Sequence, residues 1–216
     1  MKDADSPFIE TPPEGVDELF GSFTELMRRF VQLLGAEGVE RGLIGPRETQ
    51  RIWSRHILNC AVLCDLIPKG AKVADIGSGA GLPGIVLAIA RPDLSVSLIE
   101  SMTRRCEWLR FVTAEFGLSN VTVINDRAEN VQPKQAFSVV TARAVGNLMK
   151  LIPWSSPLLL RGGQAFFLKG ESVADEVLAA KNKGVLRKQR LQLVKVLELA
   201  TPLTGEVTRV VHLRKF

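Results

Sequence analysis

The fold is decided by the stretch Val73-Ala74-Asp75-Ile76-Gly77-Ser78-Gly79-Ala80-Gly81-Leu82-Pro83-Gly84. Residues 72–76 are predicted to form a short buried strand, and a helix is predicted to start at Pro83, since proline suits the first helical turn. The turn between them has glycine at positions 77, 79 and 81, where the backbone needs positive φ angles and must let a ligand approach closely. The sequence therefore predicts a nucleotide-binding turn in an α/β sheet.

The spacing of this turn distinguishes two kinds of cofactor. Dinucleotide sites use Gly-x-Gly-x-x-Gly with a helix aimed at a pyrophosphate, whereas this chain has Gly-x-Gly-x-Gly directly after Asp75. A carboxylate there would repel a pyrophosphate but suits the ammonium group of S-adenosylmethionine. Glu100 ends the next predicted strand, 25 positions after Asp75, about where an acid can bind ribose hydroxyls. S-adenosylmethionine is therefore favoured, and a glycine-rich turn that binds nothing is the alternative.

Composition limits the class of protein. The 216 residues, 46% hydrophobic and 24% charged, suffice for one core with a small extension. No apolar run approaches the ~20 residues of a membrane span, and residues 1–7 do not read as a signal peptide. We therefore expect a cytoplasmic protein, with Cys60, Cys64 and Cys106 as reduced thiols and no metal site. The net charge of +5 is weak evidence for a polyanionic partner.

The N-terminal part has a helical pattern. Residues 1–13 are predicted to be a loose arm, and apolar residues at steps of three and four predict an amphipathic helix over 16–34. A second helix is predicted from Pro46 to about Leu66. We expect residues 1–67 to be a helical extension packed on a catalytic domain of residues 68–216.

The second predicted helix carries an arginine row. Arg47, Arg51 and Arg55 are spaced by four and would share one helix face, with His56 beside them. Such a row is either a solvated stripe or a set of guanidinium groups that bind phosphates. His56 alternatively is a partly buried residue with its polar atoms satisfied.

From residue 71 the pattern alternates between strands and helices. Helices are predicted at 83–91, 102–117, 146–160 and 172–184, and strands at 72–76, 95–100, 121–125, 137–142, 163–169, 191–198 and 207–214. Strands separated by helices pair in parallel, whereas the last two, joined without a helix, should form an antiparallel hairpin. This pattern indicates an α/β fold with a seven-stranded Rossmann-like sheet of the class I methyltransferase type.

Polar residues after the strands are the candidate site, because ligands of open α/β sheets bind at the carboxyl ends of the strands. After the first three strands these are Gly77, Ser78, Gly79, Glu100 and the run Asp126-Arg127-Ala128-Glu129, which is placed to border an adenine. Arg143 follows the fourth strand, where a substrate should meet the methyl group, and Lys169 follows the fifth. The alternative for several of them is that they are ordinary polar loop residues, solvated or paired with a neighbour.

The residues at these positions also limit which kind of atom can accept the methyl group. No Asn/Asp-Pro-Pro-aromatic run, which would hold an exocyclic amine, follows the fourth strand, and Cys106 lies in a helix rather than at the site. An acceptor with a free lone pair, such as a ring nitrogen, fits best. Methyl transfer to it needs alignment and charge management more than a general base.

The chain resembles the bacterial family of small-subunit ribosomal RNA methyltransferase G, also called glucose-inhibited division protein B. The matching stretches are Arg55–Asn59, Asp75–Ile85, Leu98–Ser101, Arg127–Glu129, Thr141–Val145 and Leu168–Glu171. The resemblance implies methyl transfer from S-adenosylmethionine to N7 of one guanosine in 16S rRNA near the decoding region. The chain departs from the family at Asn59, at Arg104-Arg105 in place of two lysines, and over 40–46.

The resemblance also implies roles for single residues. The family's cofactor contacts correspond to Gly77, Leu82, Ala128, Glu129 and Arg143. The sequence pattern described above adds Asp75, Ser78, Gly79 and Glu100 to the expected cofactor site. Arg143 and Lys169 are expected to position the substrate for transfer. Apart from the resemblance, basic residues around the site are the expected RNA contacts: Arg47, Arg51, Arg55, His56, Arg104, Arg105 and Lys169, with the stretch from Lys181 to Arg190 as a further candidate.

Other functions are compatible with parts of the pattern. A methyltransferase acting on a small molecule or a protein would need an apolar acceptor pocket with few arginines. A non-catalytic RNA-binding protein would retain the fold without using the cofactor. The preferred partner is 16S rRNA in the small ribosomal subunit or an assembly intermediate, and a monomer is expected.

Overall fold

The computed structural model describes residues 8–134 and 136–216 of the chain, so residues 1–7 of the predicted arm lie outside the described part. Its strands form one sheet in the order β3-β2-β1-β4-β5-β7-β6. The strands are β1 (Lys72–Ile76), β2 (Ser95–Glu100), β3 (Val121–Asn125), β4 (Phe137–Arg143), β5 (Leu159–Lys169), β6 (Leu191–Ala200) and β7 (Val207–Lys215).

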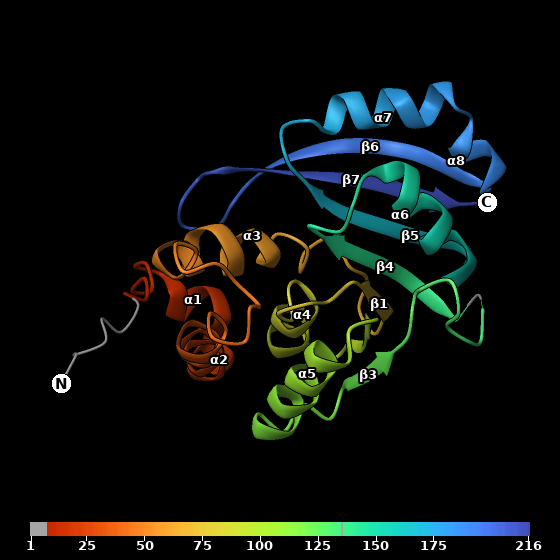
Figure 1. Cartoon of the computed structure of the whole chain (residues 1–216). Coiled ribbons are helices and arrows are strands. Elements are labelled where there is room, and N and C mark those ends of the chain that lie inside the picture. Colours follow the sequence, from red (N-terminus) through yellow and green to blue (C-terminus); the bar gives the residue numbers. More distant parts are fainter. Residues whose placement is uncertain (1–7, 135) are drawn as a thin grey trace.

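The pairing confirms the predicted fold class. Strands β1 to β5 pair in parallel, and β7 lies antiparallel between β5 and β6 (Figure 1). The predicted strand positions are correct, but β5 begins at Leu159, inside the stretch predicted as a helix. Because the carboxyl ends of β1, β2 and β4 meet at one edge, residues that directly follow these strands are brought together.

Helices cover both faces of the sheet (Figure 1). One face is covered by α4 (Gly84–Ala90) and α5 (Thr103–Glu115), the other by α6 (Leu148–Ser155), α7 (Val173–Asn182) and α8 (Val185–Lys188). Neighbouring strand residues serve opposite faces: Val73 packs in the apolar cluster with α4 and α5, and Ala74 in the cluster with α6 and α7. This alternation is the period-two pattern of a strand buried on both sides.

The first predicted helix is interrupted. It consists of α1 (Val16–Phe20), the 3₁₀ turn η1 (Gly21–Phe23) and α2 (Thr24–Glu37), and Gly21 at the break has a φ of 52°. The break falls where glycine allows the left-handed conformation that other residues resist. The predicted apolar face nevertheless packs in the same cluster as α4 and α5. The domain division at residue 68 stays a prediction.

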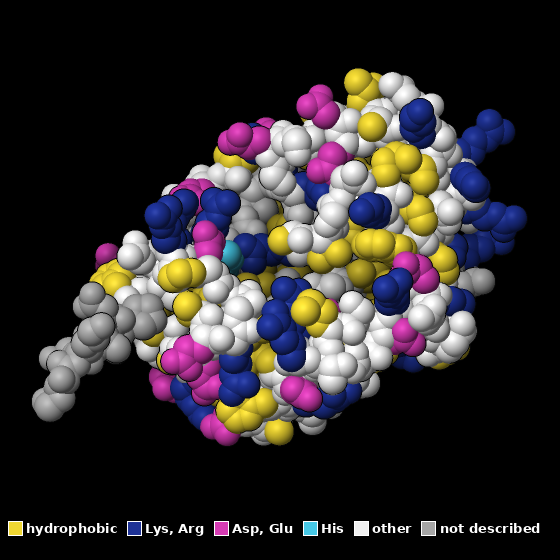
Figure 2. Space-filling view, in the orientation of Figure 1, with side chains coloured by type: hydrophobic (Ala, Val, Ile, Leu, Met, Phe, Trp, Pro, Cys, Tyr) yellow, Lys and Arg dark blue, Asp and Glu magenta, His cyan; other side chains and the backbone are white. Residues whose placement is uncertain are grey.

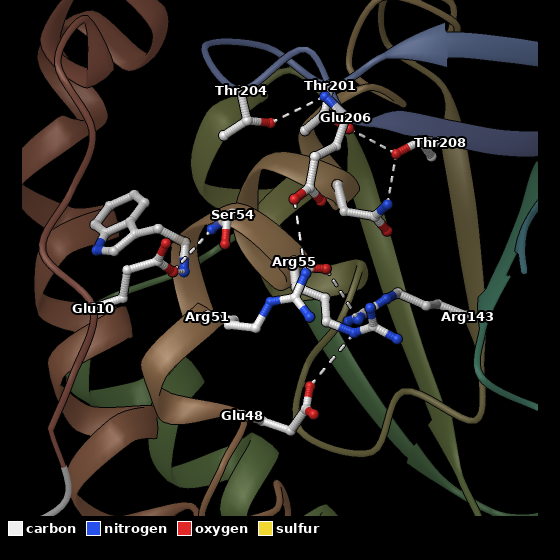
Figure 3. A network of polar contacts seen from close by, with 12 residues as sticks. Glu10, Glu48, Arg51, Ser54, Arg55, Arg143, Thr201, Thr204, Glu206 and Thr208 are labelled. Atoms are coloured by element: carbon white, nitrogen blue, oxygen red, sulfur yellow. Dashed lines mark hydrogen bonds and ion pairs between the residues drawn. The ribbon is translucent and has the colours of Figure 1, made fainter.

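The predicted helix over 46–66 is wrong as a continuous α-helix. The segment forms the 3₁₀ turn η2 (Thr49–Arg51), the π-helical η3 (Ile52–Ile57) and the short α3 (Leu58–Ala61). The Glu10 carboxylate accepts hydrogen bonds from the backbone N–H groups of Trp53 (2.7 Å) and Ser54 (3.0 Å) (Figure 3). Because these donors are satisfied from outside the segment, the regular α-helical ladder is not formed there. The arginine row predicted from a spacing of four therefore has no regular helix face to share.

The remaining helix predictions need smaller corrections. The stretch 146–160 gives α6 and the 3₁₀ turn η4 (Ser156–Leu158), and 172–184 gives α7, after which Gly184 at a φ of 64° leads into α8. Within the described residues no helix combines the length and apolar character that crossing a bilayer requires.

Candidate active site

A cavity of about 660 Å³ lies at the carboxyl ends of β1, β2 and β4, a size typical of small-molecule sites. It corresponds to the hollow near the middle of the face shown in Figure 2, with charged side chains on its rim. Of the predicted cofactor residues, the cavity is lined by Gly77, Ser78, Gly79, Leu82, Glu100, Ala128, Glu129 and Arg143. The sheet therefore gathers at one edge residues that lie up to 66 positions apart in the sequence.

The glycine turn has the backbone that was predicted for it. The φ angles of Gly77, Gly79 and Gly81 are 66°, 54° and 99°. A Cβ on Gly77 would lie 2.5 Å from a methyl carbon of Val145, so no larger residue fits. A Cβ on Gly79 would meet nothing closer than 3.7 Å. Gly77 is thus fixed by packing against the loop after β4, whereas Gly79 leaves space beside the turn.

Glu100 is the buried acid of the cavity. Its residue is 4% exposed, and its two carboxylate oxygens accept hydrogen bonds from the backbone N–H groups of Gly79 (3.1 Å) and Met102 (2.9 Å). The guanidinium of Arg105, which also lines the cavity, lies 3.9 Å from the Glu100 carboxylate. The buried Nε of Arg105 has no hydrogen-bond partner among the described residues. An acceptor and a spare donor therefore lie side by side at the end of β2.

Asp75 does not line the cavity, and the direct ligand role predicted for it is not supported. Its residue is fully buried, and its carboxylate accepts hydrogen bonds from the backbone N–H of Gly84 and the Thr141 hydroxyl, both at 3.1 Å. Burial raises the pKa of Asp75 to about 7, against these hydrogen bonds, which lower it. The carboxyl group therefore joins the start of α4 to β4 rather than facing a ligand.

A second wall of the cavity is formed by Glu48, His56 and Arg143. The Arg143 guanidinium donates a hydrogen bond to the backbone oxygen of Arg55 at 3.3 Å (Figure 3). It also contacts His56 Nδ1. His56 Nε2 lies 2.7 Å from a Glu48 carboxylate oxygen. Burial and the Arg143 charge lower the pKa of His56 to about 4, outweighing the opposite effect of Glu48.

His56 is consequently neutral at pH 7, and the contact of its Nδ1 with a guanidinium leaves the ring proton on Nε2. The residue is 7% exposed, so it is buried as the alternative interpretation requires, but its Nε2 has no hydrogen bond of good geometry among the described residues. The contact between His56 Nδ1 and the Arg143 guanidinium helps to hold the Arg143 side chain in place.

Several lining residues were missed by sequence reasoning. The irregular segment before η2 contributes Leu43, Ile44 and Gly45, and α6 contributes Trp154. These residues carry no local signal, since a loop leucine or a single helix tryptophan is typical of any core. Only the fold places them opposite the glycine turn.

The predicted role of Lys169 is wrong. Its side chain is 8% exposed, and its ammonium group lies 2.8 Å from a Glu176 carboxylate oxygen and donates to the Gly146 backbone oxygen at 2.9 Å. It does not line the cavity. A cation held this way links β5 to the loop after β4 and to α7, and it is not presented to substrate or RNA.

The remaining predicted RNA contacts lie on the surface. Arg47 and Arg104 are exposed. Arg51 and Arg55 are also exposed, and each has a nitrogen 3.7 Å from a carboxylate oxygen, of Glu206 and Glu48 respectively (Figure 3). Such exposed pairs are weak, so both guanidinium groups can exchange these acids for another anion.

The fold is similar to that of solved methyltransferases. A structure described as a SAM-dependent methyltransferase from Aquifex aeolicus has a TM-score of 0.58 at 16% identity, covering 83% of this chain and 97% of the other. A tRNA (m1A58) methyltransferase from the same organism has a TM-score of 0.53 at 16% identity, covering 74% and 68%. At these identities the likeness concerns the fold alone.

Sequence relatives are much closer. The family described as rRNA small subunit methyltransferase G matches residues 24–203. Proteins named ribosomal RNA small subunit methyltransferase G are 47% identical in Thermobifida fusca, over 93% of this chain and 84% of the relative, and 52% identical in a Nocardioides species, over 79% and 70%. These matches confirm the resemblance, the methyltransferase class and S-adenosylmethionine as the cofactor: the chain belongs to the rRNA small subunit methyltransferase G family.

Proposed function

We propose that this protein is a cytoplasmic, monomeric enzyme that transfers a methyl group to N7 of a guanosine in 16S rRNA, within the small ribosomal subunit or an assembly intermediate. Family membership supports the class of substrate. The choice of acceptor atom rests on the chemistry of the cavity wall formed by Glu48, His56 and Arg143.

The residues of the cavity fit S-adenosylmethionine. Glu100 is a buried acceptor that suits the ribose hydroxyls, and Arg105 offers an unpaired donor beside it. Gly79 lines the cavity without a side chain, so a ligand can approach its backbone. Leu82, Ala128, Gly77, Ser78 and Glu129 line the same cavity and would supply the other contacts to the cofactor. When bound, this cofactor supplies an electrophilic methyl group.

The single observation that carries the proposal is the immobilised Arg143. Arginine is the residue that proteins most often place against the O6 and N7 edge of guanine. His56 and the Arg55 backbone hold the Arg143 guanidinium at the cavity. Donation to O6 alone would orient the base and leave the N7 lone pair free to attack. Arg143 thus acts by alignment, the main requirement for an acceptor that has no proton to lose.

Two groups that other acceptor chemistries use, a cysteine thiolate and a histidine base, are not available at the cavity. None of Cys60, Cys64 and Cys106 lines it, and burial raises the pKa of Cys60 to about 11, so a thiolate nucleophile for carbon methylation is not supplied. His56, neutral and engaged by Arg143, is not free to accept a proton from an amine or hydroxyl. A ring nitrogen needs neither group.

Exposed cations at the rim would contact the RNA backbone while the target base enters the cavity. Arg47, Arg51, Arg55 and Arg104 are exposed there or on the adjoining N-terminal segment. Phosphate contacts position RNA without reading its sequence, and a splayed-out base can be read on its edges.

The test uses methyl-tritiated S-adenosylmethionine and small subunits that lack the modification, followed by nuclease digestion and identification of the labelled nucleoside. Label in 7-methylguanosine, lost in Arg143→Ala but retained in the matched control Arg110→Ala on the outer side of α5, supports the proposal. Label in another nucleoside refutes the N7 assignment. Label only in protein or in small molecules refutes RNA as the substrate.

A further inference from the structure

A second group of cations lies away from the cavity. Lys181, Lys183, Arg187, Lys188, Arg190 and Arg214 are all exposed, and we call them the α8 basic surface. Figure 2 shows Lys and Arg side chains gathered at the edge of the molecule that carries α8 and the C-terminus. They are six of the 28 Lys and Arg residues of the chain. Three of them, Arg187, Lys188 and Arg190, lie within four consecutive positions.

No acid neutralises this surface within the part of the chain that the structure describes, since none of its six members forms an ion pair there. Its positive charges also repel neighbouring basic groups, whose pKa values are lowered. The pKa of Lys215 is lowered by burial and by the Arg190 charge, and that of His212 by burial and by the Arg214 charge. Like charges held together are unfavourable in the free protein and are relieved by an anionic partner.

Helix ends account for only part of this arrangement. Cations in the last turns of α7 and α8 interact favourably with the helix dipole, which covers Lys181, Arg187 and Lys188. Arg190 precedes β6 and Arg214 lies on β7, so no helix end explains them.

Arg190 has an unusual backbone as well. Its φ of 54° lies in the left-handed region, which favours glycine and is uncommon for a long side chain. Its backbone oxygen accepts a hydrogen bond from the N–H of Phe216 at 3.1 Å, which holds this conformation. The chain therefore has a guanidinium at a position where glycine would be less strained. Strained positions of this kind are enriched at functional surfaces.

The surface is too far from the cavity to contact the acceptor base. Arg143 pairs with Leu168 on β5, whereas Arg214 pairs with Gln164 on the far side of β5. Four residues along a strand and two strands across correspond to roughly 15 Å. At about 3.4 Å per nucleotide, this is a span of four to five nucleotides. A partner that reaches both places must be larger than a nucleoside and, if it is RNA, must be at least several nucleotides long.

The chemistry of the surface favours a polyanion over a protein. Between Lys181 and Arg190 every exposed side chain is polar or charged, and Val185 is buried. Protein interfaces have an apolar core inside a polar rim. The segment itself supplies no such core, and the exposed apolar side chains beside it are Leu178 and Phe216. Clustered arginine and lysine side chains are typical of phosphate contacts.

We propose that the α8 basic surface is a second RNA-docking surface, which binds backbone phosphates of an rRNA segment remote from the methylated guanosine. This inference rests on the proposed action on rRNA. It adds that the enzyme holds its substrate at two places, with the cavity choosing the base and the α8 basic surface fixing the orientation of the surrounding RNA.

The test compares two double variants with equal loss of charge. Arg187→Gln/Lys188→Gln changes the surface, and Lys69→Gln/Arg110→Gln removes two exposed cations elsewhere. Binding of deproteinised 16S rRNA, and in parallel of small subunits, is measured by filter binding over a series of salt concentrations. The surface variant should bind more weakly, with the slope of log K against log salt reduced by about 1.4 to 1.8, which is two phosphate contacts. The control should keep the wild-type slope.

A third variant, Arg190→Gly, separates function from structure. It should weaken rRNA binding while its melting temperature stays the same or rises, because glycine accepts the left-handed backbone. A purely structural arginine would instead lower the melting temperature. Cofactor affinity and kcat at saturating subunits should be unchanged in all three variants.

Three results would overturn the inference. Equal weakening in the surface and control variants would show that only net charge matters. A wild-type salt slope in the surface variant would show that it contacts no phosphate. Weaker binding of subunits with unchanged binding of bare rRNA would assign the surface to an acidic ribosomal protein. Because binding is measured without methyl transfer, failure of the proposed N7 reaction is detected separately.

Discussion

The buried carboxyl group of Asp75 makes the stability of the protein depend on pH in a specific direction. Its pKa is raised from 3.8 to about 7 in the folded chain, chiefly by burial. The folded state therefore holds this proton more tightly than the unfolded state. The stabilisation is fully present below about pH 4 and is lost progressively as the pH rises through 7, by about 4 kcal/mol in all.

Asp75→Asn isolates this effect. The amide is isosteric with the protonated acid, so its oxygen can accept from the Gly84 N–H while its NH₂ group donates to the Thr141 hydroxyl in place of the two bonds now present. The variant should match the wild type near pH 4 and exceed it in free energy of unfolding at pH 8. Because Asp75 does not line the cavity, the affinity for cofactor should change little.

The assay is urea unfolding followed by intrinsic tryptophan fluorescence at several pH values between 4 and 8, with cofactor binding measured on the same preparations. Subtracting the free energies of unfolding of the two proteins at each pH removes, to first order, the contribution of all other titrating groups. Parallel pH profiles would refute the reasoning, because they would mean that Asp75 ionises in the folded chain without a penalty. A large loss of cofactor affinity in the variant would restore Asp75 as a direct ligand.

Four further substitutions test the other assignments. Arg105→Gln removes a guanidinium that lines the cavity, so titration calorimetry should show a roughly tenfold loss of cofactor affinity (~1.4 kcal/mol). Arg104→Gln should leave that affinity intact and raise only KM for small subunits. Equal effects of the two substitutions would contradict the placement of the two side chains. Lys169→Met should lower the free energy of unfolding by about 1–3 kcal/mol with kcat retained, and unchanged stability with a raised KM would instead restore an RNA contact. His56 is neutral above about pH 4, so wild-type kcat should not titrate near pH 6.5; a fall there that His56→Gln abolishes would show that the imidazole ionises during turnover.

The sheet and the glycine turn could be predicted because their signals are local. Short apolar strands alternate with helices, and three glycines at 77, 79 and 81 leave few other conformations. Glu100 follows from the same logic, since the carboxyl end of β2 must lie beside that turn in a parallel sheet. These predictions needed no knowledge of distant contacts.

The errors share the opposite cause. The segment 46–66 departs from a regular helix because Glu10, more than forty positions away, binds its backbone N–H groups. Lys169 and Asp75 both follow or end strands at the correct edge, but Glu176 and Gly84 hold their side chains away from the cavity. Position along a strand shows which edge a residue reaches, and only packing decides where its side chain points.

The wall opposite Glu100 was the hardest part to foresee. Its members come from an irregular segment, Leu43 to Glu48, and from His56 in the π-helical η3. Neither has a periodic pattern from which a side chain can be placed. The contact between His56 and Arg143 joins residues 87 positions apart and arises only when the N-terminal helices pack on the sheet.

We expect one cavity to hold the cofactor at Glu100 and to present its methyl group to a base at Arg143. A crystal structure of the complex with S-adenosylhomocysteine is the decisive test. It should show ribose hydroxyls within hydrogen-bond distance of Glu100, adenine against Ala128, and the sulfur facing Arg143. A nucleoside bound elsewhere, or a Glu100 carboxylate that keeps only its contacts with Gly79 and Met102, would contradict it.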